Sequence, residues 1–168
     1  MYKIYQYSSI VGNSDNKRKL LVRNQSAGDI VKALLVAVRL SLPDVCKIAY
    51  KFKQHSNQAT ALAVYDFMRK NYIYNKESSY DQTAKTFRRI LSDSKKGTTG
   101  DCKHYSTTAA AIFKCLNMPV YFRIIDQIGR LNHIFVVLKY PNYEIIVDGT
   151  SPYFNVNPSY NRKVDIKV

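Results

Sequence analysis

Apolar side chains recur every three to four positions over most of the first 115 residues, which is the spacing of one face of an α-helix. Helices of this kind are predicted over residues 29–42, 44–54, 57–72 and 82–91. Asp29 and Asn57 are suited to cap the first and third of these helices, and Pro43 is expected to end the first. The segment before Leu21 keeps no such spacing and predicts a short strand or arm followed by a loop.

The pattern changes in the second half of the chain. After one alanine-rich helix that begins at Cys102, β-branched and aromatic residues dominate three segments, which predict strands over 120–125, 133–140 and 143–147. Pro141 and Asn142 form a two-residue connector between the last two strands, and this favours an antiparallel hairpin. The tail from Ser151 onward reads as irregular coil. Helices followed by a small antiparallel sheet indicate an α+β fold.

The junction between the two halves holds the first candidate for chemistry. A glycine-containing loop, Gly97–Asp101, precedes Cys102, and counting back seven residues from the apolar Ala109 places Cys102 on the inward stripe of its helix. A thiol at a helix N-terminus is favoured in its thiolate form by the helix dipole. Cys102 is therefore placed as a nucleophile would be.

A thiol nucleophile needs a base, and the base needs an orienting acceptor. His104 diverges from Cys102 by about 200° around the helix, so we expect it to be a surface or wall residue. His55 lies in a polar connector and should be solvated. His133 begins an apolar strand and is the candidate base. A two-residue hairpin would place it diagonally from Asp148 on the same face of the sheet.

These segments resemble the transglutaminase-like superfamily of papain-fold cysteine enzymes. The likeness spans residues 59–151 and rests on the segments GDCKHYSTTAAAIFKCLNMPVYFRII, NHIFVVL and IIVDGT, with upstream ALAVYDFMRKNYIYNKE and QTAKTFRRIL. It implies a papain-like core with an active-site helix packed on a small antiparallel sheet. Within that core Cys102 would be the nucleophile, His133 the general base and acid, and Asp148 the orienting carboxylate. Unlike many members, the chain has no Trp, and Phe135 stands where Trp is common.

The resemblance further implies attack on an amide carbonyl of a protein or peptide, through a thioester that passes to water or an amine. Hydrolysis by a protease or amidase is favoured over crosslinking acyl transfer, because no second domain is evident to hold an amine donor. The backbone amide of Cys102 can serve as one oxyanion donor. The hydroxyls of Tyr72 and Tyr74 are the candidates for the second, against the more common role of such tyrosines as packing residues with solvated hydroxyls.

The composition excludes several other classes of protein. The apolar fraction is 46% and the charged fraction 23%, which is typical of a globular chain. No phosphate-binding glycine run or dinucleotide motif is present, so no cofactor is implied. Cys102, His104, His133 and Asp148 lack the close ligand pairs of a structural zinc site, so no metal is expected either.

A net charge of +14 can attract nucleic acid or an acidic protein surface. We expect nucleic-acid binding to be weak and sequence-blind at most. The rival to an enzyme is a catalytically inactive binding or structural module of a bacterial or bacteriophage assembly, which would dock acidic protein or nucleic acid. The excess of basic residues is densest in residues 1–58, which we expect to form a basic arm and helices, with the catalytic core at 59–151 and coil at 152–168, all in one compact domain.

The cysteine pattern bears on the compartment. Cys46, Cys102 and Cys115 form no even framework and no Cys-x-x-Cys pair, so each is expected to be a free thiol. The first ten residues carry no recognisable secretory signal, and the longest apolar run, 33–38, is far shorter than a membrane span. The sequence thus predicts a cytoplasmic protein in a reducing compartment without membrane contact, or a virion-associated one if the source is a phage.

Overall fold

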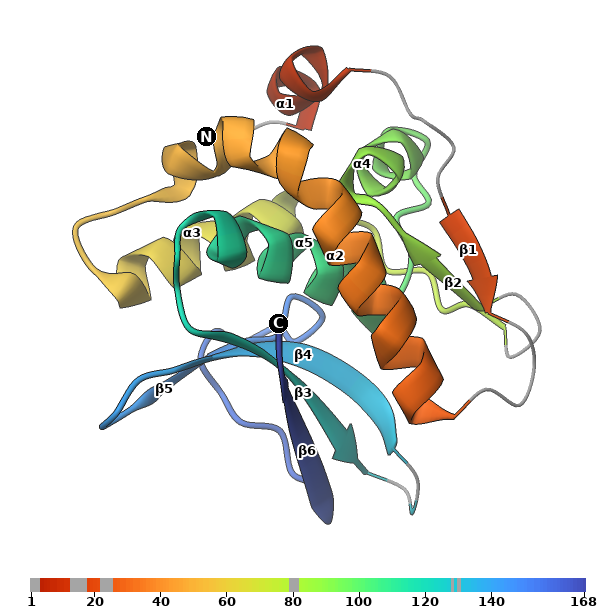
Figure 1. The fold of residues 1–168 in the computed structure, drawn as a ribbon, viewed down its shortest axis with the longest axis vertical. Coiled ribbons are helices and arrows are strands. Elements are labelled where there is room, and N and C mark those ends of the chain that lie inside the picture. The colour runs from red at the N-terminus through yellow and green to blue at the C-terminus, as the bar shows by residue number, and fades with distance from the viewer. Residues whose placement is uncertain (1–3, 13–17, 22–25, 79–81, 128, 130) are drawn as a thin grey trace.

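A computed structural model describes residues 4–12, 18–21, 26–78, 82–127, 129 and 131–168. Helices gather on one side of a four-stranded antiparallel sheet, with a two-stranded sheet at the far edge (Figure 1). The helices are α1 (Ile4–Val11), α2 (Ala27–Ala49), the 3-10 helix η1 (Tyr50–Phe52), α3 (Asn57–Asn71), α4 (Phe87–Lys95) and α5 (Cys102–Cys115). The strands are β1 (Arg18–Leu21), β2 (Gln82–Lys85), β3 (Val120–Asp126), β4 (Leu131–Lys139), β5 (Glu144–Val147) and β6 (Arg162–Lys167).

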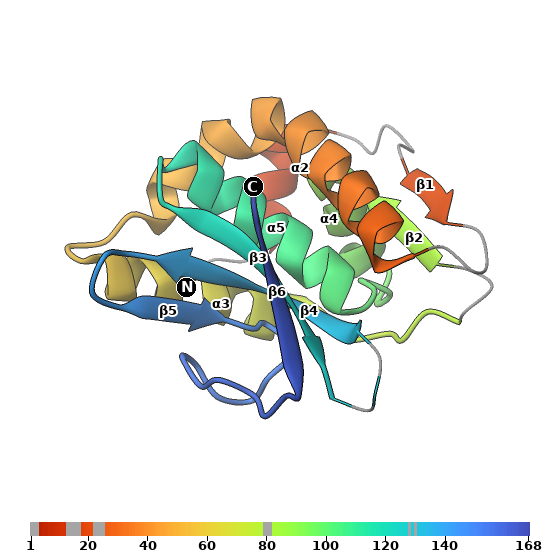
Figure 2. The same ribbon diagram turned by 60° about the horizontal axis from the view of Figure 1, so that its bottom comes forward.

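Helix α5 lies at the centre of the fold, between α2 and the four-stranded sheet (Figure 2). Its middle, residues 109–113, is fully buried. Burial on all sides fixes the orientation of this helix, so the residue at its N-terminus, Cys102, has a defined place relative to the sheet. The predicted α+β class is confirmed.

The predicted strand or arm near the N-terminus is wrong in part, because residues 4–11 form the helix α1. Residues 18–21 form the strand β1, and most of the predicted loop, at residues 13–17, lies outside the described residues. Tyr7 and Val11 are both buried and lie four positions apart, the spacing of one helix face. The Tyr7 ring stacks on Phe52 and meets the edge of Phe67. Contacts with residues more than 40 positions away therefore stabilise a helix that its own sequence specifies weakly.

The predicted break at Pro43 is also wrong, because α2 runs through it from Ala27 to Ala49. Ser26, not Asp29, is the N-cap, and its side chain accepts a hydrogen bond from the amide of Asp29. Pro43 and Arg39 are both exposed, so the carbonyl of Arg39 that Pro43 cannot bond faces water. This carbonyl is open to solvent, and the buried residues on the opposite face of α2 hold the helix together.

The helix predicted over 82–91 is wrong in its first half. Residues 82–85 form β2, which pairs antiparallel with β1, and Thr86 then caps α4. The third helix is confirmed, with Ser56 as its cap in place of the expected Asn57.

The four-stranded sheet has the order β5-β4-β3-β6 with all pairs antiparallel. The predicted hairpin is confirmed, since Lys139 lies opposite Glu144 and Val136 opposite Val147. The coil predicted for 152–168 is wrong at its end, because β6 pairs with β3 along its length. The buried Arg123 of β3 donates hydrogen bonds to both carboxylate oxygens of Asp165 on β6. This ion pair joins two strands that lie about 40 residues apart in the sequence.

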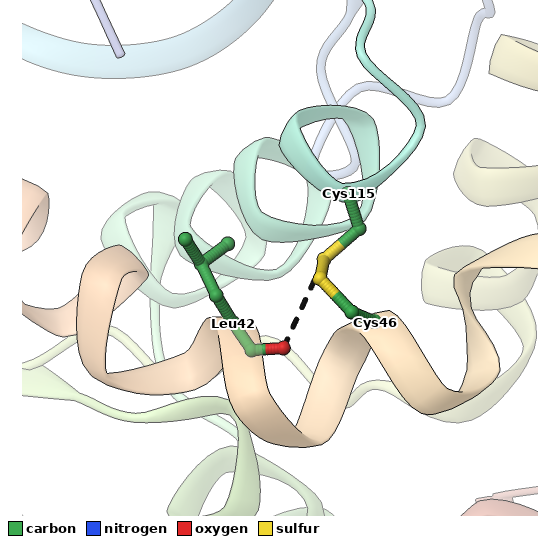
Figure 3. The surroundings of a disulfide bond; sticks show 3 residues. All are labelled: Leu42, Cys46 and Cys115. Atoms are coloured by element: carbon green, nitrogen blue, oxygen red, sulfur yellow. Dashed lines mark hydrogen bonds between the residues drawn. A yellow bond between two sulfur atoms is a disulfide. The ribbon is translucent and has the colours of Figure 1, made fainter.

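Two of the three cysteines form a disulfide, so the expectation of three free thiols is wrong. Cys46 of α2 and Cys115 at the end of α5 are bonded, with their Cα atoms 5.1 Å apart (Figure 3). They are 69 residues apart, and only the packing of α2 on α5 brings them together. Cys102 is the free cysteine. The inference of a reducing compartment loses its premise, since disulfides persist mainly under oxidising conditions.

No helix in the described part of the chain is both long and apolar enough to cross a bilayer.

Candidate active site

The N-terminus of α5 is held by a dense set of hydrogen bonds. Asp101 caps the helix through its side chain, which accepts from the amide of Lys103, while the amide of Asp101 donates to Nδ1 of His104. Gly100 has a φ of +127°, and a Cβ there would lie 2.1 Å from His104 Nδ1. Only glycine fits at this turn. The turn presents Cys102, half-buried, as the first residue of the helix.

His133 and Asp148 meet at one edge of the sheet. His133 Nε2 lies 2.7 Å from Asp148 Oδ2, the distance of a charge-assisted hydrogen bond. The second carboxylate oxygen of Asp148 accepts from the amide and the hydroxyl of Thr150, at 3.0 and 2.7 Å. Asp148 is thus held from both sides and has one oxygen left for the imidazole.

Cys102 is near enough to the His133 ring to contribute to its pKa. Because Nε2 faces Asp148, Nδ1 is the ring nitrogen left for the thiol. Burial lowers the pKa of His133, but hydrogen bonds to Asp148 and to Cys102 outweigh it and raise the pKa to about 10. Burial likewise raises the pKa of Asp148, and the hydrogen bond from His133 reverses this and lowers it. The arrangement favours the imidazolium form of His133 beside the carboxylate of Asp148.

The two tyrosines that were candidates for an oxyanion donor have different environments in the structure. The Tyr72 hydroxyl is buried and lies 2.9 Å from Thr108 Oγ1, six residues along α5 from Cys102, or about 9 Å of helix rise. This position does not favour a role at the thiol. Tyr74 is half exposed, and its pKa is raised by burial and by the nearby charges of Cys102, Asp101 and Asp148. Tyr74 therefore borders the site.

Comparison with protein families matches residues 47–138 to the model of the transglutaminase-like superfamily. The chain belongs to the transglutaminase-like superfamily. The match includes Cys102 and His133 and ends before Asp148, so the placement of Asp148 in this transglutaminase-like domain rests on its contact with His133. The family and fold that the sequence resemblance implied are confirmed.

Two solved structures resemble this transglutaminase-like domain. One is described as a "putative cysteine protease" from Cytophaga hutchinsonii, with 22% identity and a TM-score of 0.53 over 79% of this chain and 46% of that one. The other is a TGase, with 14% identity and a TM-score of 0.42 over 94% of this chain and 39% of that one. The first supports the fold. The chain spans less than half the length of either protein, and no curated protein matches it.

A buried ionic cluster behind Cys102 is a feature that the sequence did not indicate. Lys103 is buried and pairs with Asp101 and with Glu77, whose Oε2 lies 3.6 Å from its ammonium. Lys85 of β2 pairs with Glu77 and, at 3.0 Å, with Asp93 of α4. These ion pairs tie β2 and α4 to the start of α5. The ion pairs stabilise the segment that positions the thiol, and none of these four pairs involves Cys102 itself.

His104 belongs to this cluster, so its predicted surface or wall position is wrong. Its side chain is fully buried, Nδ1 accepts from the amide of Asp101, and Nε2 lies 3.2 Å from the hydroxyl of Thr83. Both ring nitrogens are therefore engaged away from His133.

The same cluster has ligand types that a metal could use, because atoms of Glu77, Asp101 and His104 lie within 4.8 Å of one another. The ammonium of Lys103 pairs with both of these carboxylates. A second cation at this position would be repelled by the lysine. The cluster is better described as a buried salt bridge than as a metal site.

Proposed function

We propose that this domain is a cysteine enzyme that cleaves an amide bond in a protein or peptide, with Cys102 as nucleophile, His133 as general base and acid, and Asp148 as the orienting carboxylate. The contact that supports the proposal most directly is the 2.7 Å hydrogen bond between His133 and Asp148, because Cys102 also contributes to the raised pKa of the same imidazole. A nucleophile, a base and an orienter in that order are the parts that acyl transfer needs.

The reaction follows from the placement of these groups. The sulfur of Cys102 attacks the carbonyl carbon, and the resulting oxyanion accepts a hydrogen bond from the Cys102 amide, one of the free donors at the start of α5. Tyr74, at the border of the site, is the candidate for a second donor. His133 gives its proton to the departing amine, which leaves a thioester on Cys102. His133 then takes a proton from the water that releases the acid.

Water is the acceptor we favour over an amine. A lysine ammonium approaching the thioester would need a free acidic group to hold it. Asp148 and Asp101, the carboxylates that adjoin the site, are each paired with a cation, Asp148 with His133 and Asp101 with Lys103. Hydrolysis is therefore the reaction that the local charges favour.

The test is the alkylation rate of Cys102 at a pH of about 6, compared with that of glutathione. Iodoacetamide labelling followed by peptide mapping reports the thiol without knowledge of the substrate, and the disulfide keeps the other two cysteines from reacting. We expect Cys102 to react much faster than glutathione, and His133→Ala to remove the difference. Equal rates for Cys102 and glutathione would favour an inactive binding module.

A second measurement separates hydrolysis from acyl transfer. The protein is incubated with casein and a fluorescent primary amine, and both new amino termini and amine incorporation are counted. New termini without incorporation, absent in Cys102→Ala, are the expected result. Incorporation of the amine without new termini would instead assign the domain to crosslinking.

A further inference from the structure

Arg69 is an exposed cation in the last turn of α3. Its neighbour Lys70 pairs with Asp66 at 3.3 Å, whereas no ion pair or hydrogen bond of Arg69 occurs among the residues that the structure describes. A guanidinium without a protein partner keeps all its donors for a ligand.

The end of α3 lies against the segment that follows Asp148. Tyr65, one helical turn before Arg69 and on the same face, donates a hydrogen bond from its hydroxyl to the carbonyl of Ser151 at 2.9 Å. Met68, next to Arg69, lies so close to Gly149 that a Cβ there would be 2.8 Å from the Met68 methyl. The last turn of α3 therefore borders the candidate active site.

Helix α5 completes this border from the other side. A Cβ on Gly149 would lie 2.7 Å from the ring of Tyr105, three residues after Cys102. The ring of Tyr105 in turn lies 6.3 Å from that of Tyr74, measured between centroids. Tyr105 and Tyr74 thus connect the residue that follows Asp148 with the start of α5.

The charge of Arg69 reaches these tyrosines. Burial raises the pKa of Tyr105 to about 12, and the positive charge of Arg69 opposes that rise. Burial also raises the pKa of Tyr65, again opposed by Arg69. Two hydroxyls, one on α3 and one on α5, are thus near enough to Arg69 for its charge to act on them, which agrees with the contacts that the end of α3 makes with residues 149 and 151.

We propose that Arg69 binds a carboxylate of the substrate close to the amide that Cys102 attacks, so that the enzyme prefers acidic peptides. A guanidinium matches a carboxylate with two parallel hydrogen bonds. The carboxylate could be an acidic side chain or the free C-terminus of the substrate. This assignment rests on the proposed function, because it concerns selection by the same thiol.

The experiment compares alkylating probes that differ in charge. N-bromoacetyl-glutamate amide carries a side-chain carboxylate, N-bromoacetyl-glycine carries a terminal carboxylate, and N-bromoacetyl-glutamine amide is the neutral reference. Rates of Cys102 alkylation are measured at low salt in the wild type, in Arg69→Gln, and in Lys70→Gln as the matched control. The control removes a neighbouring cation that is already paired with Asp66.

We expect at least one acidic probe to gain about 3- to 10-fold over the neutral probe in the wild type, the size of a partly solvated charge contact. The gain should vanish in Arg69→Gln and persist in Lys70→Gln, and the probe that loses more identifies the source of the carboxylate. An equal gain in wild type and Arg69→Gln would overturn the assignment. A neutral probe that reacts with Cys102 no faster than with glutathione would instead refute the proposed function, so the two failures are distinguishable.

Discussion

Replacing Asp148 with asparagine changes one atom at the centre of the candidate triad. In the wild type one carboxylate oxygen accepts from His133 Nε2 and the other from Thr150. Asparagine can keep the bond to Thr150 with its carbonyl oxygen, so the fold should persist. Its NH₂ group then faces Nε2, which must become an acceptor. The proton of the neutral imidazole moves to Nδ1, the nitrogen that should receive the proton of Cys102.

The size of the effect follows from the bond that is lost. A hydrogen bond to a charged group contributes about 1.5 to 3 kcal/mol, and 1.4 kcal/mol corresponds to a tenfold change in rate. Asp148→Asn should therefore slow the alkylation of Cys102 at pH 6 by about 10- to 150-fold. The loss should be greatest at low pH, where an isolated thiol is protonated and only the ion pair with imidazolium keeps it reactive.

The assay is the second-order rate with iodoacetamide, followed by the mass of the intact protein. Asp165→Asn is the matched control, because Asp165 is also a largely buried carboxylate paired with basic side chains of the sheet. Combining Asp148→Asn with His133→Ala should add little to the effect of His133→Ala alone, since the two residues act through one contact. A folded Asp148→Asn protein that reacts like the wild type at every pH would refute the triad.

Three further predictions concern stability and the site. The pKa of His133 is raised, so its stabilising contribution is complete below about pH 6.5 and is lost as the pH rises to about 10. The difference between the unfolding free energies of wild type and His133→Gln, measured in urea, should therefore shrink over that range. A difference that stays constant with pH would contradict this prediction. Removing the Cys46–Cys115 disulfide, which closes a loop of 69 residues, should cost about 4 kcal/mol in the free energy of unfolding; unchanged unfolding under reducing conditions, or three titratable thiols in the native protein, would count against the bond. Gly149→Ala places a methyl group against the ring of Tyr105 and should lower the free energy of unfolding by about 1 to 3 kcal/mol, with slower alkylation of Cys102. Thermal unfolding like that of the wild type would show that the ring can move aside.

The parts of the site that depend on local patterns could be predicted from the sequence. The apolar stripe around Ala109 defines a helix whose first residue is Cys102, and a two-residue connector sets the pairing of the next two strands. Because strand side chains alternate strictly, that pairing alone places His133 diagonally from Asp148. Each step involves residues within about 20 positions of one another, so spacing is enough to predict it.

The surroundings of the site depend on contacts that no local pattern encodes. His104 and Lys103 are polar residues in the first turn of a helix, where water is the usual neighbour. Both are buried because the segment holding Glu77 and the strand β2 close over the start of α5 and supply their partners. The role proposed for Arg69 also depends on a distant contact, since Tyr65 of the same helix bonds Ser151.

The sequence by itself determined the helix of Cys102, the hairpin of His133 and Asp148, and the α+β class, because periodicity and turn length act over short distances. Only the tertiary structure decided that α2 continues through Pro43, that residues 162–167 form a strand, and that Cys46 meets Cys115. In each case the conformation depends on contacts with residues distant in the chain or with solvent. The free energy of the whole fold, and not the preference of the segment, selects the conformation there.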